Sequence, residues 1–209
     1  MDIIITIFSL IILLFSVVIH ELAHGSVAYS LGDLTAKYQG RLTLNPIKHL
    51  DLFGSIILPL LLLLATAGQG PVFGWAKPVP INPYNFRDQK WGSLKVAISG
   101  PLSNLSLALF FGLILRFIPV QFLNNFPGLF LIFSFIVQIN IILALFNLIP
   151  IPPLDGSWIL FDLLPAGLSQ VKTFLQQYGI YMLIFLIFFG GLGGLYDFVG
   201  FLYHLITGF

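Results

Sequence analysis

Long apolar segments dominate this chain and leave few folds open to it. The longer segments can each cross a hydrocarbon core of about 30 Å, which takes about 20 helical residues. Because a bilayer offers no water to hydrogen-bond unpaired backbone N–H and C=O groups, such segments form helices, which pair these groups internally. We therefore expect an all-α polytopic membrane protein with four to five transmembrane helices, as a single domain over residues 1–209. The long segments are Ile3–Leu31, Leu94–Ile118, Leu129–Ile149 and Tyr178–Leu205, and a shorter one is Leu52–Ala67.

The composition supports a membrane setting. Only 8% of the 209 residues are charged and 58% are hydrophobic, whereas soluble domains carry about 25% charged residues. The lipid bilayer is therefore the expected partner, and the formal net charge of +1 gives no reason to expect nucleic acid. The chain has no cysteine, so nitrogen and oxygen have to bind any metal ion. The first segment follows Asp2 and lacks a small-residue cleavage site, so we expect it to be retained.

Some stretches interrupt the helical pattern. Residues 38–46 alternate loosely between polar and apolar and end in the turn dipeptide Asn45-Pro46, which predicts a short membrane-associated strand over Gln39–Leu44. Residues 70–83 contain too many prolines for a helix and predict an extended segment packed against protein. Leu52–Ala67 carries Pro59 and is short for a full crossing, which favours a re-entrant element.

Ionisable residues gather near the end of the first apolar segment, in His20-Glu21-Leu22-Ala23-His24. Positions i and i+4 of a helix share a face, so the two imidazoles can reach one metal ion. Glu21 is the only glutamate of the chain and lies beside the first ligand, where it can deprotonate water. Burying such groups near lipid is costly unless they are paired with one another or bind a metal ion. The motif therefore predicts metal-assisted hydrolysis.

A third protein ligand is needed, and Asp155 is the acidic residue in a comparable setting. Asp155-Gly156 after two prolines is also an ordinary turn signal, so the local sequence leaves both roles open. His20 and Asp155 lie at the C-terminal ends of their apolar runs and meet only if the two helices run parallel. That requirement favours a re-entrant Leu52–Ala67, because a full crossing there would give the wrong number of crossings.

The basic residues give an independent argument about orientation. If Leu52–Ala67 crosses fully, the lysines and arginines divide almost evenly between the two sides. If it is re-entrant, all nine Lys and Arg residues except Arg116 share one side. The positive-inside rule then places both chain ends outside and the catalytic mouth toward the cytoplasm.

Three motifs, in this order, resemble the signatures of the site-2 protease family of intramembrane zinc metalloproteases. The resemblance covers about Ile3 to Leu164 and implies one Zn²⁺ per chain, with His20, His24 and Asp155 as ligands and Glu21 as the catalytic base. It also implies that Asn104 and Asn147 line the substrate groove, that the strand at Gln39–Leu44 pairs with unwound substrate, and that this is a compact form without PDZ or CBS domains. The motifs are His20-Glu21-Leu22-Ala23-His24, Ser99-Gly100-Pro101-Leu102-Ser103-Asn104, and Asn147-Leu148-Ile149-Pro150 with Leu154-Asp155-Gly156.

These observations favour a zinc metalloendopeptidase that cuts in or near the transmembrane segments of membrane-anchored substrates. We expect it in a bacterial or archaeal cell membrane. The alternative is a non-enzymatic membrane protein that binds or transports metal through the same three ligands. A transporter would show polar residues along a crossing path and repeat symmetry, and the sequence shows neither. We expect the Asn140 side chain to form a hydrogen bond between helices, and Asn104 and Asn147 can do the same. The sequence does not indicate the substrate or the oligomeric state.

Overall fold

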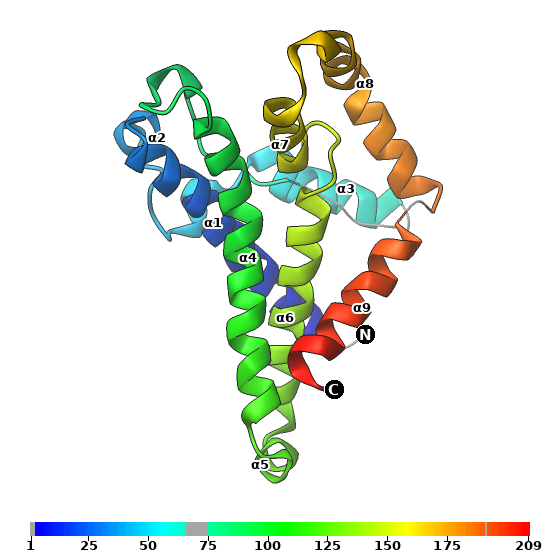
Figure 1. The fold of residues 1–209 in the computed structure, drawn as a ribbon. Helices are drawn as coiled ribbons and strands as arrows, with labels where there is room; N and C mark the ends of the chain where they lie inside the picture. Colours follow the sequence, from blue (N-terminus) through cyan, green and yellow to red (C-terminus); the bar gives the residue numbers. More distant parts are fainter. Residues whose placement is uncertain (1–2, 66–74, 191) are drawn as a thin grey trace.

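The computed structural model describes residues 3–65, 75–190 and 192–209, and within these ranges it contains helices and no strand. Four helices are long and apolar enough to cross a membrane (Figure 1). Three of them agree with the predicted segments to within about two residues at each end. The all-α membrane fold is thereby confirmed for the described residues. The four helices are α1 (Ile3–Ser30), α4 (Gly92–Phe117), α6 (Pro127–Asn147) and α8 (Ser169–Phe188).

The core lies where α1, α4 and α6 pack together and where α9 (Gly193–Thr207) returns against α4 and α6. Close approach depends on Gly112, because a Cβ there would lie 2.4 Å from Cγ2 of Ile206. Arg116 Nη1 also donates to the carbonyl of Leu205 at 2.6 Å, at the end of α9. Packing of this kind holds helices together in lipid, where water exclusion does not drive them into contact. The buried cluster contains Ala108, Leu115, Leu123, Val137, Ile141, Val199 and Tyr203.

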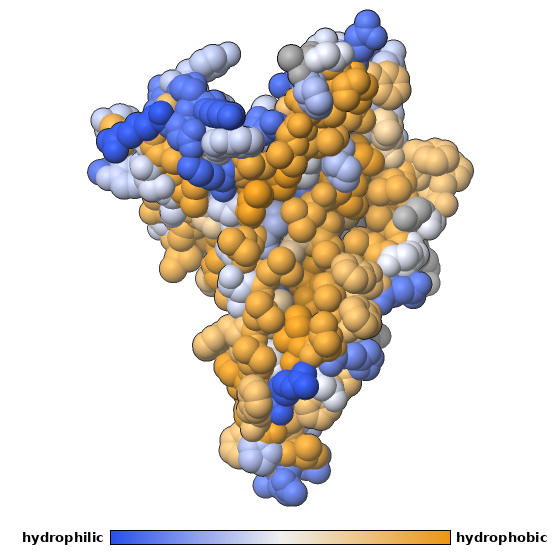
Figure 2. Space-filling model, viewed as in Figure 1, coloured by the Kyte–Doolittle hydropathy of each residue, from blue (hydrophilic) through white to orange (hydrophobic). Residues whose placement is uncertain are grey.

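The surface divides by polarity along the long axis of the bundle. Figure 2 shows hydrophobic residues over most of the visible face, with hydrophilic ones gathered mainly at the end that carries α2 (Thr35–Tyr38) and the start of α4. Smaller hydrophilic groups lie at the opposite tip, beside α5 (Val120–Asn125). An apolar belt between two polar ends is the expected surface of a protein that crosses a bilayer.

The last predicted crossing, Tyr178–Leu205, is wrong as a single helix. α8 ends at Phe188 and α9 begins at Gly193. Between them Gly190 has φ +79°, a left-handed conformation that ends a helix and that glycine adopts without steric cost. α8 therefore diverges from the bundle, while α9 turns back to pack on it (Figure 1).

The predicted strand over Gln39–Leu44 is not formed; residues 39–44 form turns and bends. Gly40 has φ +62°, and the N–H of Arg41 turns back to the carbonyl of Ala36 at 2.9 Å. A strand needs a neighbouring ladder for its backbone groups. Here a local turn takes the backbone donor instead, so the loose alternation of this stretch was too weak a signal.

The chain next makes an excursion, residues 52–65, whose two flanks lie close together. A π-helical stretch, η2 (Leu52–Ile57), leads into α3 (Leu58–Ala65), which lies across the direction of α4 and α6 (Figure 1). The chain is described again from Trp75, whose N–H donates to the carbonyl of Gly54 at 3.1 Å. Gly54 permits this contact, because a Cβ there would lie 2.3 Å from the Trp75 ring. The two flanks of the excursion are therefore neighbours.

Two predicted stretches are only partly described. Residues 75–82 of the expected extended segment contain no helix, which agrees with the prediction. Residues 70–74 of that segment, and residues 66–67 of the predicted re-entrant element, lie outside the described residues. The chain reaches α4 through the short helix η3 (Pro83–Asn85).

A buried aspartate ties the end of α1 to the segment that precedes α4. Asp33 is 1% exposed; its Oδ2 accepts from the N–H of Asn82 at 2.7 Å and its Oδ1 from the Asn85 side chain at 2.9 Å. The backbone and hydroxyl of Thr35 donate to Oδ1 as well. Burial alone would raise the pKa of Asp33, but these hydrogen bonds favour the ionised carboxylate and lower the pKa below its usual value.

The first prediction concerns helix packing. Gly112→Leu should lower the stability of the protein by about 1–3 kcal/mol, because the new side chain would have to displace Ile206 and separate α4 from α9. Thermal unfolding in detergent measures the effect. Gly128→Leu is the control, since a Cβ at Gly128 meets no atom within 4 Å. Equal loss in both variants would contradict the packing argument.

The second prediction concerns pH. Because the pKa of Asp33 is lower in the folded state, its stabilisation is present above the unfolded value of about 3.9 and is lost as the pH falls through the folded value. Asp33→Asn should therefore cost about 2 kcal/mol at neutral pH. The difference from wild type should shrink on acidification, as followed by unfolding at a series of pH values. A gap that widens in acid would contradict the assignment.

Candidate metal centre

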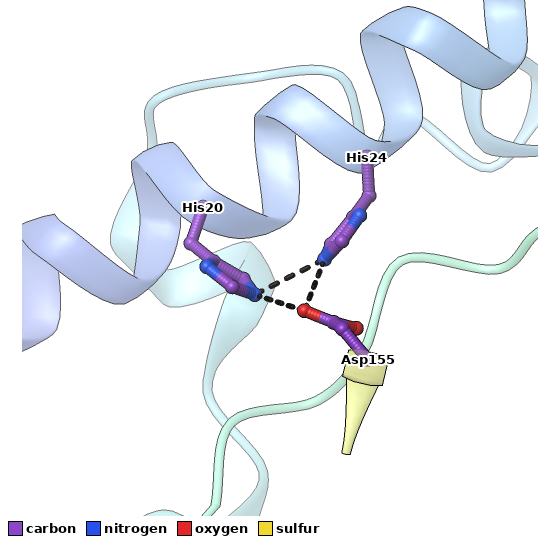
Figure 3. A group of neighbouring side chains, drawn as sticks. All are labelled: His20, His24 and Asp155. Carbon is purple, nitrogen blue, oxygen red and sulfur yellow. Dashed lines mark hydrogen bonds and ion pairs between the residues drawn. The ribbon is translucent and has the colours of Figure 1, made fainter. Parts of the chain in front are cut away.

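Three side chains from two elements converge on one point. His20 and His24 project from one face of α1, and Asp155 is the first residue of α7 (Asp155–Leu163) (Figure 3). Oδ2 of Asp155 lies 3.0 Å from Nε2 of His20 and 3.2 Å from Nε2 of His24, and the two Nε2 atoms are 3.0 Å apart. Both histidines are 6% exposed. The i, i+4 spacing thus places both imidazoles on one face of α1, as predicted (Figure 3).

The hydrogen bonds behind the imidazoles fix their tautomers. Nδ1 of His20 lies 2.6 Å from the amide oxygen of Asn104, and Nδ1 of His24 lies 2.7 Å from the carbonyl of Val96. Both partners are acceptors, so each Nδ1 carries the proton in the neutral ring. Each Nε2 then presents a lone pair toward the centre.

Two lone pairs and a carboxylate oxygen facing one another form a donor set that requires a cation. The three ligand atoms all lie within 4.8 Å of one another. In a tetrahedral zinc site, ligand atoms are roughly 3.3 Å apart, given zinc–ligand distances of about 2.0–2.2 Å. The separations of 3.0 to 3.2 Å are close to that spacing. Nitrogen and oxygen ligands with one position left open are those of catalytic zinc, so the residues fit this ion.

α4 approaches the Nε2 atoms of both histidines at Gly100. A Cβ on Gly100 would lie 2.3 Å from Nε2 of His24 and 2.6 Å from Nε2 of His20. The backbone of α4 therefore passes within contact distance of the imidazoles only because this residue has no side chain. Gly100 has no role predicted from the sequence, although it lies in the motif Ser99–Asn104 and is a glycine within an apolar helix.

Asn104 belongs to a buried polar network behind His20. Its amide group donates to the side-chain oxygen of Asn140 at 2.8 Å and to the carbonyl of Ser16 at 3.3 Å, and Asn140 donates to the hydroxyl of Ser16 at 2.9 Å. Asn104 and Asn140 are each 0% exposed. The helix-to-helix hydrogen bond expected for Asn140 is present. The substrate contact expected for Asn104 stays a prediction, and the structure adds a contact with His20 that the sequence did not indicate.

The other candidates, Glu21 and Asn147, make hydrogen bonds outside the three-ligand group. Glu21 is half-buried, and its Oε2 accepts from the backbone N–H of Val79 at 2.7 Å. Asn147, near the end of α6, donates to the carbonyl of Leu143 on its own helix at 2.9 Å, so its predicted contact with substrate stays a prediction. Asp155 is placed by a tight turn: a Cβ on Gly156 would lie 2.3 Å from the carbonyl oxygen of Leu148.

Comparison with known proteins finds a peptidase family and relatives that are named as putative zinc metalloproteases. Residues 123–190, which include Asp155, match the family described as "Peptidase family M50". A relative from Bacillus subtilis (strain 168), named "Putative zinc metalloprotease YwhC", is 47% identical over 181 residues, covering 85% of this chain and 77% of the relative. No solved structure gives a significant match.

Two more distant relatives carry the same kind of name. Rip2 of Mycolicibacterium smegmatis is 28% identical over 83% of this chain and 64% of its own length. MJ0611 of Methanocaldococcus jannaschii is 34% identical over 68% of this chain and 63% of its own length. The match to YwhC covers most of both chains and agrees with the family match over the later helices. The chain is therefore a member of the site-2 protease family, peptidase family M50.

Proposed function

We propose that this protein is an intramembrane zinc metalloendopeptidase that hydrolyses peptide bonds in or near the transmembrane segments of membrane-anchored substrates. The observation that carries the proposal is the convergence of two imidazole lone pairs and one carboxylate oxygen within 3.2 Å. The names of the relatives and the family membership support the same activity.

Each residue of the site has one role in the proposed reaction. His20, His24 and Asp155 would hold one zinc ion, which when bound supplies a Lewis acid that polarises a peptide carbonyl and activates water. Glu21 follows His20 directly in α1 and would take a proton from the attacking water and return it to the leaving amine. Asn104 and the Val96 carbonyl keep both imidazoles in the ligating tautomer. Asn147 is proposed to contact the substrate.

The location of the ligands supports a substrate within the membrane. His20 and His24 lie inside the apolar span Ile7–Ser30, and α4 and α6, which pack around them, are spans as well. A peptide bond in a helix has its carbonyl already hydrogen-bonded, so the substrate has to unwind locally before attack. Reaction at this depth therefore requires an unwound stretch of a transmembrane segment.

The flanks of α3 support the proposed orientation. Trp75 returns beside Gly54 and Lys77 beside His49, with N–H to carbonyl distances of 3.1 and 2.9 Å. An excursion whose ends meet makes no net crossing, so residues 52–65 act as a re-entrant element. The side that carries Lys37, Lys95 and the other basic residues is then cytoplasmic, with Arg116 alone on the opposite side. The catalytic mouth faces the cytoplasm of a prokaryotic cell in this arrangement.

A metal transporter remains the competing class. Transport needs polar groups along a path across the bilayer. In the described residues the three-ligand group is the only cluster of metal-binding type, and it lies at one depth. Its partners Ser16, Asn104 and Asn140 are sealed in the core rather than lining a route. These observations favour hydrolysis over transport.

The third prediction separates catalysis from metal binding. Glu21→Gln should lower cleavage by at least about 10²-fold, because the substituted side chain cannot accept the proton from water. It should still bind one zinc per chain, whereas His24→Ala should lose both the zinc and the activity. Zinc content of purified protein and N-terminal proteomics of membranes carrying each variant measure the two properties.

The controls follow from the same design. Membranes carrying the wild-type protein should contain cleavage products that are absent from both variants. Products that persist in Glu21→Gln membranes would refute the base assignment, and a wild-type protein without stoichiometric zinc would refute the proposed reaction.

The fourth prediction distinguishes the two asparagines. Asn104→Ala should weaken zinc binding by about 10- to 100-fold, because His20 loses the acceptor that orients its ring. Asn147→Ala should leave zinc affinity unchanged and reduce cleavage. Competition with a chelator of known affinity measures the first effect. Ser106→Ala, which removes a hydroxyl bonded to its own helix at Leu102, is the control for a change in α4. Similar zinc affinity in Asn104→Ala and Ser106→Ala would contradict the role of Asn104.

A further inference from the structure

The segment Trp75–Asn82 lies against α1 on the face that carries Glu21. The sequence forces an extended backbone there, since Lys77 and Val79 each precede a proline. Pro78 and Pro80 have no N–H, so Val79 supplies the only backbone donor of the Pro78-Val79-Pro80 triplet. That donor points to Glu21, with the N–H of Val79 lying 2.7 Å from Oε2.

Two buried charged residues fix the register of this segment. Arg41, 5% exposed, donates through Nη2 to the carbonyl of Lys77 at 2.6 Å and to that of Pro78 at 3.2 Å. Beyond Val79, the N–H of Asn82 donates to Oδ2 of Asp33 at 2.7 Å. The backbone on both sides of Val79 is therefore held by charge-assisted hydrogen bonds, which are stronger than neutral ones. A slip of one residue would place a proline at the glutamate.

The helix surface is shaped to admit the segment. Gly25 lies one turn beyond Glu21 on the same face of α1. A Cβ on Gly25 would lie 2.9 Å from Cγ1 of Val79 and 2.6 Å from Cδ2 of Leu42. Val79 is 5% exposed, so its side chain fills the space that Gly25 leaves. The close approach that this glycine permits brings the Val79 N–H within reach of the carboxylate.

From these contacts we infer that Val79 is a positioning residue for catalysis, whose backbone N–H holds Oε2 of Glu21 so that Oε1 is aimed at the attacking water. This inference rests on the proposed function. A glutamate has several rotatable bonds and, without a partner, samples many orientations, each of which lowers the fraction of molecules ready for proton transfer. The hydrogen bond selects one orientation. Arg41 and Asp33 act through the segment, by keeping the Val79 donor in register.

The single glutamate of the chain makes the contact directly observable. Protein made with [δ-¹³C]glutamate reports the carboxylate of Glu21 alone, by its carbon chemical shift or its carboxylate stretching band. Val79→Pro removes the donor at a site already flanked by prolines. Val79→Ala keeps the donor and removes side-chain packing, so it measures the structural part of any effect.

The expected result has two parts. The carboxylate signal should shift in Val79→Pro relative to wild type and Val79→Ala, with the zinc content of Val79→Pro equal to that of Val79→Ala. Turnover of the natural cleavage products in isolated membranes should fall about 10- to 100-fold further in Val79→Pro than in Val79→Ala, the size of a small misplacement of a catalytic group. If Val79→Pro does not fold, the α-hydroxy analogue of valine at position 79 replaces the N–H by oxygen and decides the question.

Failure of this inference differs from failure of the proposed function. A carboxylate signal that is the same in wild type, Val79→Ala and the donor-less variant overturns the contact whether or not the protein is active. Equal turnover in Val79→Ala and the donor-less variant overturns its catalytic role. A wild-type protein without stoichiometric zinc would instead refute the proposed function, and would leave the spectroscopic test of the contact standing.

Discussion

The arrangement of the whole bundle depends on one electrostatic constraint: three electron-pair donors are held within 3.2 Å of one another in a largely buried region. Without a cation, two imidazole lone pairs and a carboxylate would repel one another in a low-dielectric setting. α1 supplies two of the donors, and the turn after α6 supplies the third. α4 packs against both α1 and α7, and approaches the two imidazoles at the distance that Gly100 allows. The packing of α1, α4 and α6 thus brings the three donors together.

Much of this could be read from the sequence, because the strongest signals are short-range. The apolar segments gave α1, α4 and α6 to within about two residues, and the spacing of His20 and His24 gave a shared helix face. The family motifs pointed to Asp155, which the structure brings to the two histidines. These features follow from helical periodicity and from the cost of burying ionisable groups in lipid.

What the sequence did not give depends on contacts between distant residues. The strand at Gln39–Leu44 failed because Gly40 and Arg41 close a turn on Ala36, and a loose alternation cannot reveal that competition. The helix break at Gly190 was hidden in a run of glycines that are equally typical of tight helix packing. Nothing local shows that the amide of Asn104 lies behind His20, and its predicted contact with substrate stays a prediction. The hydrogen bond from Trp75 to Gly54, which brings the flanks of α3 together, is likewise a long-range contact.

One consequence follows from the distribution of the ligands along the chain. Asp155 is 131 residues from His24, so the two meet only after α4 and α6 have been inserted and packed. A growing polypeptide that has displayed only its first helix lacks the carboxylate that completes the donor set. Under the proposed function, the enzyme is inert while it is being synthesised and acquires hydrolytic competence late in assembly.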